Sequence, residues 1–107
     1  KKPEALIAFL IDVFTNPKDI VLDYHLGCGT TSAVAHKLQR RYIGMEQMDS
    51  QISLIKTRLQ NVISGDSTGI SQSVDWQGGG SFIYCELAKA NQQFADEVVL
   101  KILLKCH

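Results

Sequence analysis

The sequence predicts an α/β fold built on a partial, three-stranded parallel sheet flanked by helices on both faces. Short apolar runs of strand length alternate along the chain with longer segments whose apolar residues recur at helical spacing. Strands that alternate with helices pair in parallel through right-handed crossovers. The 107 residues, 45% hydrophobic and 21% charged, allow one small globular domain or a piece of a larger one.

The first half of the chain supplies two helices and two strands. Pro3 suits the start of a helix over residues 3–15, which Asn16 and Pro17 end. The apolar run 20–22 lies between a turn and a glycine-rich loop, as expected of a buried parallel strand. We expect the second helix from Ser32 to Gln39 and the second strand over 42–46.

The second half continues the alternation. Asp49 or Ser50 can cap a third helix, which Gly65 closes, and the glycines and serines of residues 64–81 predict a long loop. A third strand is expected over 82–85 and a final helix over 86–107. Its segment 98–104 is apolar almost all round. It either packs on another part of the protein or another subunit, or comes from an altered reading frame at a truncated end.

Composition and charge exclude several classes of protein. Eleven basic residues balance eleven acidic ones, so no strongly basic face is implied, and a nucleic-acid partner would need a local patch. The three cysteines lack the paired spacing of zinc sites or disulfide frameworks, and no metal site is expected. No signal peptide or membrane-spanning run is evident, so we expect a cytoplasmic protein without a membrane partner. The chain begins with Lys1 rather than Met, which suggests an excised or processed fragment.

The most informative segment is the loop between the first strand and the second helix. Gly27 and Gly29 allow a tight bend and close approach of a ligand. The amides of Thr30 and Thr31 then lie at a helix amino end, which attracts carboxylate or phosphate. Glu46 ends the next strand 17 residues after Gly29, where nucleotide-binding α/β folds hold a ribose-binding acid. Together these residues predict a pocket for an adenosine-containing ligand.

Two other phosphate-binding patterns fit less well. A triphosphate-binding loop would need Gly-Lys-Ser or Gly-Lys-Thr, which is absent. The dinucleotide fingerprint would need glycine or alanine where Ser32 stands. This mismatch favours another adenosine ligand. An NAD-dependent oxidoreductase fragment stays an alternative, and so does a non-catalytic remnant or interaction module.

Several segments resemble the cofactor half of the β-class S-adenosylmethionine-dependent DNA amino-methyltransferases, the N6-adenine/N4-cytosine family. They are residues 2–4, 16–23, 27–31 and 41–46. The resemblance implies a Rossmann-like methyltransferase fold that binds S-adenosylmethionine at the carboxyl ends of its strands.

Two later segments, 65–71 and 76–87, resemble the modification subunit of type III restriction-modification systems, which methylates adenine at N6. The resemblance covers about residues 1–97, taken as the cofactor-binding part of a DNA methyltransferase domain, and leaves 98–107 as an apolar tail of undetermined origin. It implies DNA and a restriction subunit as partners, and exposed sheet and helix faces leave self-association open.

The resemblance also assigns cofactor-binding residues by position. Lys2 and Pro3 match the motif beside the methionine end of the cofactor, and Glu46 matches the ribose-binding acid. His25 and Cys28 depart from the family's usual phenylalanine and serine. The loop around the amino-acid moiety is matched by Asp23, Gly27, Cys28, Gly29, Thr30 and Thr31.

No catalytic residue is expected within the chain. The family's Asp-Pro-Pro-Tyr-like motif needs adjacent prolines, and Pro3 and Pro17 are the only prolines here. In the β class that motif and the target-recognition region lie upstream of the cofactor loop. DNA would therefore be bound through the missing remainder, and we expect the chain alone to be unable to methylate DNA.

Several of these residues also have a structural interpretation. Asp23 could simply tie down the loop, Cys28 is best taken as a small packing residue, and Asp66 as part of a helix-ending turn. Trp76 could serve a partner-contact loop or a hydrogen-bonded turn. We expect Arg40 and Arg41 to be a solvated pair before a strand.

Overall fold

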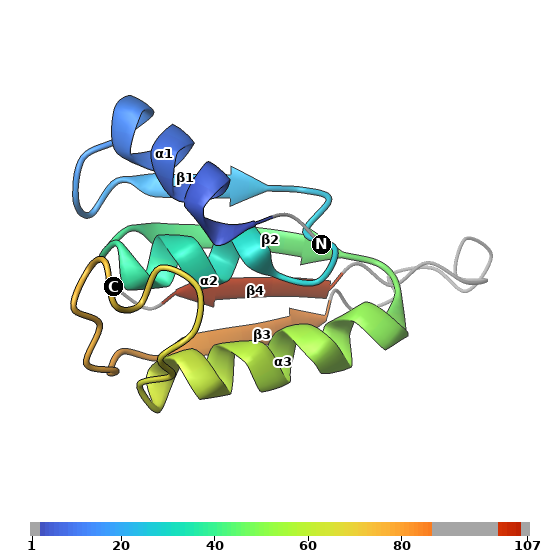
Figure 1. The fold of residues 1–107 in the computed structure, drawn as a ribbon. Coiled ribbons are helices and arrows are strands. Elements are labelled where there is room, and N and C mark those ends of the chain that lie inside the picture. Colours follow the sequence, from blue (N-terminus) through green and yellow to red (C-terminus); the bar gives the residue numbers. More distant parts are fainter. Residues whose placement is uncertain (1–2, 87–100, 106–107) are drawn as a thin grey trace, which may run out of the picture.

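The computed structural model describes residues 3–86 and 101–105, which form a mixed four-stranded sheet and three helices (Figure 1). Along the chain the elements are α1 (Glu4–Phe14), β1 (Ile20–Asp23), α2 (Thr30–Lys37), β2 (Arg41–Glu46), α3 (Asp49–Ile63), β3 (Phe82–Glu86) and β4 (Lys101–Lys105). The order of strands across the sheet is β1-β2-β4-β3. The α/β class predicted from the sequence is therefore confirmed.

The sheet differs from the predicted one in its last strand. β1 and β2 are parallel, whereas β4 runs antiparallel to both of its neighbours, β2 and β3. The three expected strands thus share one direction, but β4 separates β3 from β2. The expected helix over 86–107 is wrong for residues 101–105, and its residues 87–100 lie outside the described part. Residues 101–105 form a strand because they pair with both β2 and β3. In this pairing Leu103 lies opposite Gly44 and Tyr84 and is fully buried.

All three helices of the described residues lie on one face of the sheet (Figure 1). α2 packs on β1 and β2, and α1 and α3 both pack on α2. Tyr42 and Leu103 are buried beneath them. The expectation of helices on both faces is wrong for this part of the chain, because no described helix covers the second face.

Local sequence accounts for the ends of the helices. Pro3 precedes α1 as its N-cap, with φ −68° and ψ 139°, a conformation that proline adopts readily. The predicted capping of α3 by Asp49 or Ser50 is not observed, since Met48 is the N-cap and no side chain caps the helix. Gly65 follows α3 with φ 92°, the left-handed conformation that ends many helices. Residues 64–81 contain no helix or strand, as predicted.

Arg40 is buried between α1 and the start of β2. It is only 5% exposed, and its guanidinium donates to Thr15 Oγ1 at 2.9 Å and to the Leu38 carbonyl at 2.8 Å. The expected solvated pair is therefore wrong for Arg40, whereas Arg41 is exposed. No helix among the described residues combines the length and apolarity needed to cross a membrane.

Candidate functional site

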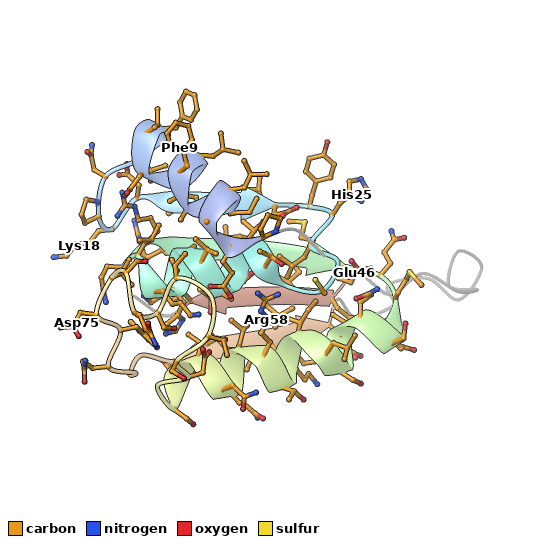
Figure 2. The ribbon with its side chains drawn as sticks, viewed as in Figure 1. Phe9, Lys18, His25, Glu46, Arg58 and Asp75 are labelled. Carbon is orange, nitrogen blue, oxygen red and sulfur yellow. The ribbon has the colours of Figure 1, made fainter. Side chains whose placement is uncertain are left out.

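The loop that joins β1 to α2 lies at the edge of the sheet where β1 and β2 end. Figure 2 shows His25 and Glu46 at this edge. The Leu26 amide donates to the Met45 carbonyl at 2.9 Å, which ties the loop to the end of β2. Gly27 and Gly29 have φ of 63° and 91°, so the bend uses the left-handed conformations that glycine tolerates best.

Glu46 closes the loop through its carboxylate. Oε1 accepts a hydrogen bond from the Gly27 amide at 2.8 Å, and Oε2 accepts from the Gln47 and Met48 amides, both at 3.0 Å. Partial burial raises the pKa of Glu46, but these bonds from Met48, Gly27 and Gln47 outweigh it, so the pKa lies below its usual value. Glu46 is therefore ionised near neutral pH and fixed beside the glycine bend.

Asp23 holds the other side of the loop. Its Oδ1 accepts from the His25 amide at 3.0 Å, and its Oδ2 accepts from the Thr31 hydroxyl at 2.7 Å. These two bonds join the end of β1 to the first turn of α2. The loop-fixing role weighed for Asp23 in the sequence is therefore present in the structure.

The start of α2 presents backbone amides without a partner. Those of Cys28, Thr31 and Ser32 have no hydrogen-bond acceptor in the part of the chain that the structure describes. At a helix amino end such amides, together with the helix dipole, favour an anion. A Cβ added at Gly27 would meet no atom within 4 Å, so the backbone there borders open space. The bend can therefore accept a carboxylate of a ligand.

An open cleft of about 930 Å³ adjoins the loop. Among the predicted site residues it is lined by Pro3 and Cys28, whereas Asp23 and Glu46 do not line it. The Arg58 guanidinium, labelled in Figure 2, reaches into this region from α3 and donates to Thr30 Oγ1 at 2.9 Å. Partial burial raises the pKa of the Cys28 thiol, but the Thr30 hydrogen bond and the Arg58 charge outweigh it and the pKa is lowered.

An ionic network at the wall of this cleft, to which Glu4, Arg58 and Asp66 belong, was not predicted from the sequence. Glu4 Oε1 accepts from Lys37 Nζ at 3.0 Å, and Glu4 Oε2 accepts from Arg58 at 2.7 Å. Lys37 has a fully buried side chain and also lies 3.5 Å from Asp66 Oδ1. The network joins α1, α2 and α3 to the loop after α3. A charged residue on the apolar side of each helix is the one sequence signal that could have indicated it.

Asp66 and Trp76 fix the long loop after α3. Asp66 Oδ1 accepts from the Thr68 amide at 2.8 Å, and Trp76 Nε1 donates to the Val62 carbonyl at 2.6 Å. The helix-ending turn expected at Asp66 and the hydrogen-bonded turn weighed for Trp76 are therefore present.

Ser32 occupies the close contact between α2 and β2. It is 1% exposed, and its Oγ has no hydrogen-bond partner among the described residues. A Cβ at Gly44 would lie 2.5 Å from Leu26 Cδ2 and 3.0 Å from Ser32 Oγ. The glycine that permits close helix–strand packing is therefore on the strand, which explains how the helix tolerates Ser32.

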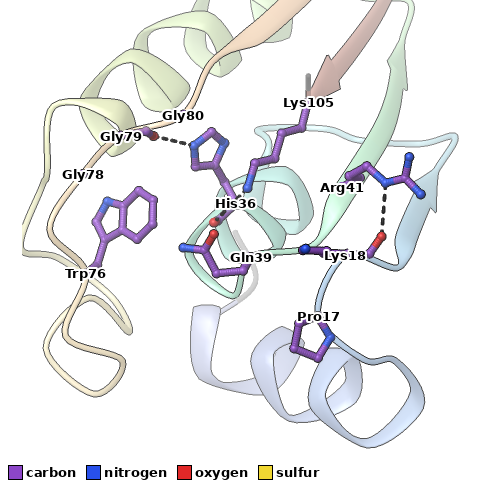
Figure 3. Close-up of a pocket in the computed structure, with 10 residues that line it drawn as sticks. All are labelled: Pro17, Lys18, His36, Gln39, Arg41, Trp76, Gly78, Gly79, Gly80 and Lys105. Carbon is purple, nitrogen blue, oxygen red and sulfur yellow. Dashed lines mark hydrogen bonds between the residues drawn. The ribbon is translucent and has the colours of Figure 1, made fainter. Parts of the chain in front are cut away.

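A second cavity, of about 860 Å³, lies where β1 and β2 begin (Figure 3). Lys18, Arg41 and Lys105 line it, together with the buried His36. The His36 ring contacts Tyr42 OH at 3.1 Å and the Gly79 carbonyl at 2.8 Å. Burial lowers the pKa of His36, with the nearby Lys105 charge acting in the same direction. None of the predicted cofactor residues lines this cavity.

The structure thus brings most of the predicted residues to one loop and its flanking strand ends. Asp23, Glu46 and the segment Gly27–Thr31 meet there, and Pro3 borders the adjoining cleft. Lys2 lies outside the described residues. Among the described residues, no group of three or more His, Cys, Asp or Glu side chains could hold a metal ion.

Comparisons with known proteins match the sequence of this chain to DNA methylases. The DNA methylase family model matches residues 1–57. Over 99 residues the chain is 56% identical to a probable type III restriction-modification enzyme, the HindVI Mod subunit of Haemophilus influenzae strain Rd, covering 92% of this chain. Over 62 residues, 58% of the chain, it is 42% identical to the type II methyltransferase M.HinfI of Haemophilus influenzae.

The chain spans only 13% of the first relative's length and 17% of the second's. No solved structure matches it. The family match nevertheless covers more than half of the chain and includes α1, the loop after β1 and the acid at the end of β2. The chain therefore belongs to the DNA methylase family.

Proposed function

We propose that this chain is the S-adenosylmethionine-binding portion of a site-specific DNA adenine-N6 methyltransferase of a type III restriction-modification system. The observation that carries the proposal is the juxtaposition at the end of β1. A glycine bend with partnerless amides at the start of α2 lies beside an ionised acid at the end of β2. That combination suits a ligand with a carboxylate at one end and ribose hydroxyls further along.

Each residue has a defined task in this proposal. The amides of Cys28 and Thr31 bind the methionine carboxylate, and Asp23 keeps the loop in its bent shape through the Thr31 hydroxyl. Three of the four acceptor positions of the Glu46 carboxylate are taken by backbone amides, which leaves one for a ribose hydroxyl. Gly27 and Gly29 set the bend. When bound, the cofactor supplies the methyl group that is transferred.

The methionine end of the cofactor is assigned to Pro3, with Lys2 beside it. Pro3 borders the cleft next to Cys28, as the resemblance to the family implies. Cys28 takes part through its backbone, so the thiol that replaces the usual serine hydroxyl is compatible with binding.

The activity and partners proposed for the whole protein follow from its relatives. Type III modification is the activity named for the HindVI Mod subunit, which is 56% identical to this chain. We extend that activity, the DNA substrate, the restriction subunit and the cytoplasmic location to the protein of which this chain is a part. Adjacent prolines for the family's catalytic motif are absent from the 107 residues, so the chain binds cofactor without transferring methyl groups on its own.

Titration calorimetry with S-adenosylhomocysteine tests the proposal directly. We expect saturable one-to-one binding, weakened about 10-fold to 100-fold by Glu46→Gln, since a hydrogen bond to a charged group contributes about 1.5–3 kcal/mol. Glu46→Gln keeps an oxygen for the Gly27 amide. Asp12→Asn is the matched control, because Asp12 is an exposed acid on α1 away from the loop.

The alternatives give different results in the same experiment. An oxidoreductase fragment would bind NAD in competition with S-adenosylhomocysteine, and a non-catalytic remnant would bind neither. If the parent chain and Glu46→Gln bound S-adenosylhomocysteine with equal affinity, Glu46 would not contact the ligand.

A further inference from the structure

The second cavity, where β1 and β2 begin, is lined by basic groups and by no acid. Lys18, Arg41 and Lys105 border its space of about 860 Å³, and no Asp or Glu of the described residues lines it. The chain as a whole carries equal numbers of basic and acidic residues, so the excess of positive charge is local. The volume lies within the range of small-molecule sites, about 300–1,000 Å³.

Lys105 is a half-buried cation with no acid beside it in the part of the chain that the structure describes. Its Nζ lies 3.5 Å from the His36 carbonyl oxygen. Burial lowers the pKa of Lys105, because the ammonium group loses contact with water. Four other basic residues with little exposed side chain each pair with a carboxylate: Lys37, Arg40, Arg58 and Lys101. Lys105 therefore lacks the counter-charge that such groups normally have.

The glycine segment 78–80 adds backbone donors to the cavity wall. The Gly79 amide donates to the Ile63 carbonyl at 2.8 Å, but the amides of Gly78 and Gly80 have no acceptor among the described residues. Gly78 and Gly80 both line the cavity. Backbone amides that lack an acceptor within the protein commonly bind phosphate. The wall thus supplies neutral donors beside the basic side chains.

The wall that carries these amides is held in place by the buried His36. The His36 Nε2 atom lies 2.8 Å from the Gly79 carbonyl oxygen, and a Cβ at Gly80 would lie only 2.6 Å from the same nitrogen. The Trp76 ring meets the His36 ring edge-on at 5.5 Å between centroids. Trp76 is itself fixed by donation from Nε1 to the Val62 carbonyl at 2.6 Å. The glycine segment is therefore positioned before any ligand binds.

Main-chain hydrogen bonds hold Lys18 at the same cavity. The Lys18 amide donates to the Gln39 carbonyl at 3.0 Å, and Arg41 Nε donates to the Lys18 carbonyl at 3.1 Å. In Figure 3 the side chains of Lys18 and Lys105 both extend toward Gln39. Two ammonium groups thus face one cavity, and like charges repel each other unless an anion lies between them.

We propose that the second cavity binds a phosphate group, which Lys18 and Lys105 hold together with the amides of Gly78 and Gly80. The group belongs to a small phosphorylated molecule or to the backbone of a nucleic acid. The cavity lies at the amino ends of β1 and β2, whereas the glycine bend and Glu46 lie at the carboxyl ends, about 20 Å away along the six residues of β2. The proposal is therefore independent of cofactor binding.

Titration of the 107-residue chain with sodium pyrophosphate, followed by amide signals in NMR, tests the site. We expect the signals of Gly78 and Gly80 to shift along one saturable curve. The indole signal of Trp76, the only tryptophan of the chain, should shift with them. Lys18→Gln and Lys105→Gln should each raise the dissociation constant about 10-fold, because each removes a charged hydrogen-bond donor. Neither variant should change the affinity for S-adenosylhomocysteine.

Lys56→Gln is the matched control. It removes the same charge from a half-buried lysine, but Lys56 lies on α3, with its Nζ 3.7 Å from the centre of the Tyr84 ring, and does not line the cavity. An equal loss of affinity with Lys56→Gln would overturn the proposal, because it would show attraction by overall charge alone. If Lys105→Gln does not fold, Lys18→Gln decides the question, since Lys18 is exposed.

A short DNA duplex, titrated in the same way, distinguishes the two sources of the phosphate. Shifts at Gly78 and Gly80 with pyrophosphate but not with duplex support a small phosphorylated ligand. Shifts with duplex that Lys18→Gln weakens and Lys56→Gln does not support the nucleic-acid backbone. If neither probe gives saturable shifts at Gly78 and Gly80, the cavity is not a phosphate site, whatever calorimetry shows for S-adenosylhomocysteine.

Discussion

The two glycines of the loop after β1 share the left-handed region but differ in their surroundings. At Gly27 an added Cβ would face open space, whereas at Gly29 it would lie 3.2 Å from Ile55 Cγ1. Ile55 is fully buried and cannot move aside easily. Gly27 therefore borders open space, whereas Gly29 permits the close packing of α3 against the start of α2.

Alanine at each position should separate these roles. For Gly29→Ala we expect a loss of about 2–3 kcal/mol in unfolding free energy, because left-handed strain adds to crowding against Ile55. Gly27→Ala should cost only about 0–1 kcal/mol, since strain is partly offset by a less flexible unfolded chain. Urea unfolding of the two variants provides the comparison. Equal losses would mean that contact with Ile55 contributes nothing.

The sequence indicated the individual residues of the loop after β1 but not those of the ionic network around Glu4. Gly27, Gly29 and Glu46 could be predicted because a bend after a strand and an acid after the next strand are local patterns. Glu4, Lys37 and Arg58 could not, since they are far apart in sequence and meet only when three helices pack on one another.

The network of Glu4 connects whole elements. Its carboxylate is 8% exposed and accepts from Lys37 of α2 and Arg58 of α3. Glu4→Gln keeps one oxygen as an acceptor but removes the negative charge, so Asp66 at 3.5 Å is the one acid left beside the buried Lys37 charge among the described residues. We expect a loss of about 3–5 kcal/mol in thermal or urea unfolding, as for other broken buried pairs.

A surface pair provides the control for that loss. Asp12 is 66% exposed and lies 3.4 Å from Arg40, so Asp12→Asn should cost about 0–1 kcal/mol. Similar losses in the two variants would show that the buried position of Glu4 does not matter.

β4 is the element that sequence patterns misassigned. The apolar run 98–104 has neither strand nor helix periodicity, and periodicity alone does not distinguish a buried strand from a buried helix. What makes residues 101–105 a strand is pairing with β2 and β3, which lie far away along the chain. Such non-local partners leave no trace in a local pattern.

Neighbouring leucines of β4 should differ in their contribution to stability. Leu103 is fully buried under the helices, so Leu103→Ala should cost about 2–5 kcal/mol. Leu104 is half-buried on the second face, and Leu104→Ala should cost about 1 kcal/mol because less apolar area returns to water. Urea unfolding of both variants tests this, and a larger loss at Leu104 would contradict the assignment of faces.

The titratable groups of the whole molecule predict sensitivity to acid. Burial raises the pKa of Glu4, but Arg58, Lys37 and the Ile70 amide outweigh it, so the pKa lies below 4.5. Asp66 shows the same balance, with burial opposed by Thr68 and Lys37. Depressed acids contribute stability that is present above their unfolded pKa, about 4.5 for Glu, and lost as pH falls through the folded pKa.

We therefore expect the unfolding free energy to fall as pH is lowered from about 5 to 3. The Glu4→Gln variant should show a shallower decline, because it lacks one of the groups that must take up a proton. Urea unfolding at each pH gives the slope. A free energy that stays constant or rises over this interval would contradict the pKa directions.

The chain by itself is expected to bind cofactor without methylating DNA. The described residues include a loop suited to a cofactor but, with Pro3 and Pro17 as the only prolines of the chain, no adjacent-proline motif to position a flipped base. In-line methyl transfer requires both reactants in one site, and losing that alignment removes about 7–11 kcal/mol of catalysis. Labelled S-adenosylmethionine and duplex DNA should therefore give no sequence-dependent methylation with the chain alone, even at concentrations that saturate binding in calorimetry. Incorporation by the chain, abolished by Glu46→Gln, would show that a complete active site exists within these 107 residues.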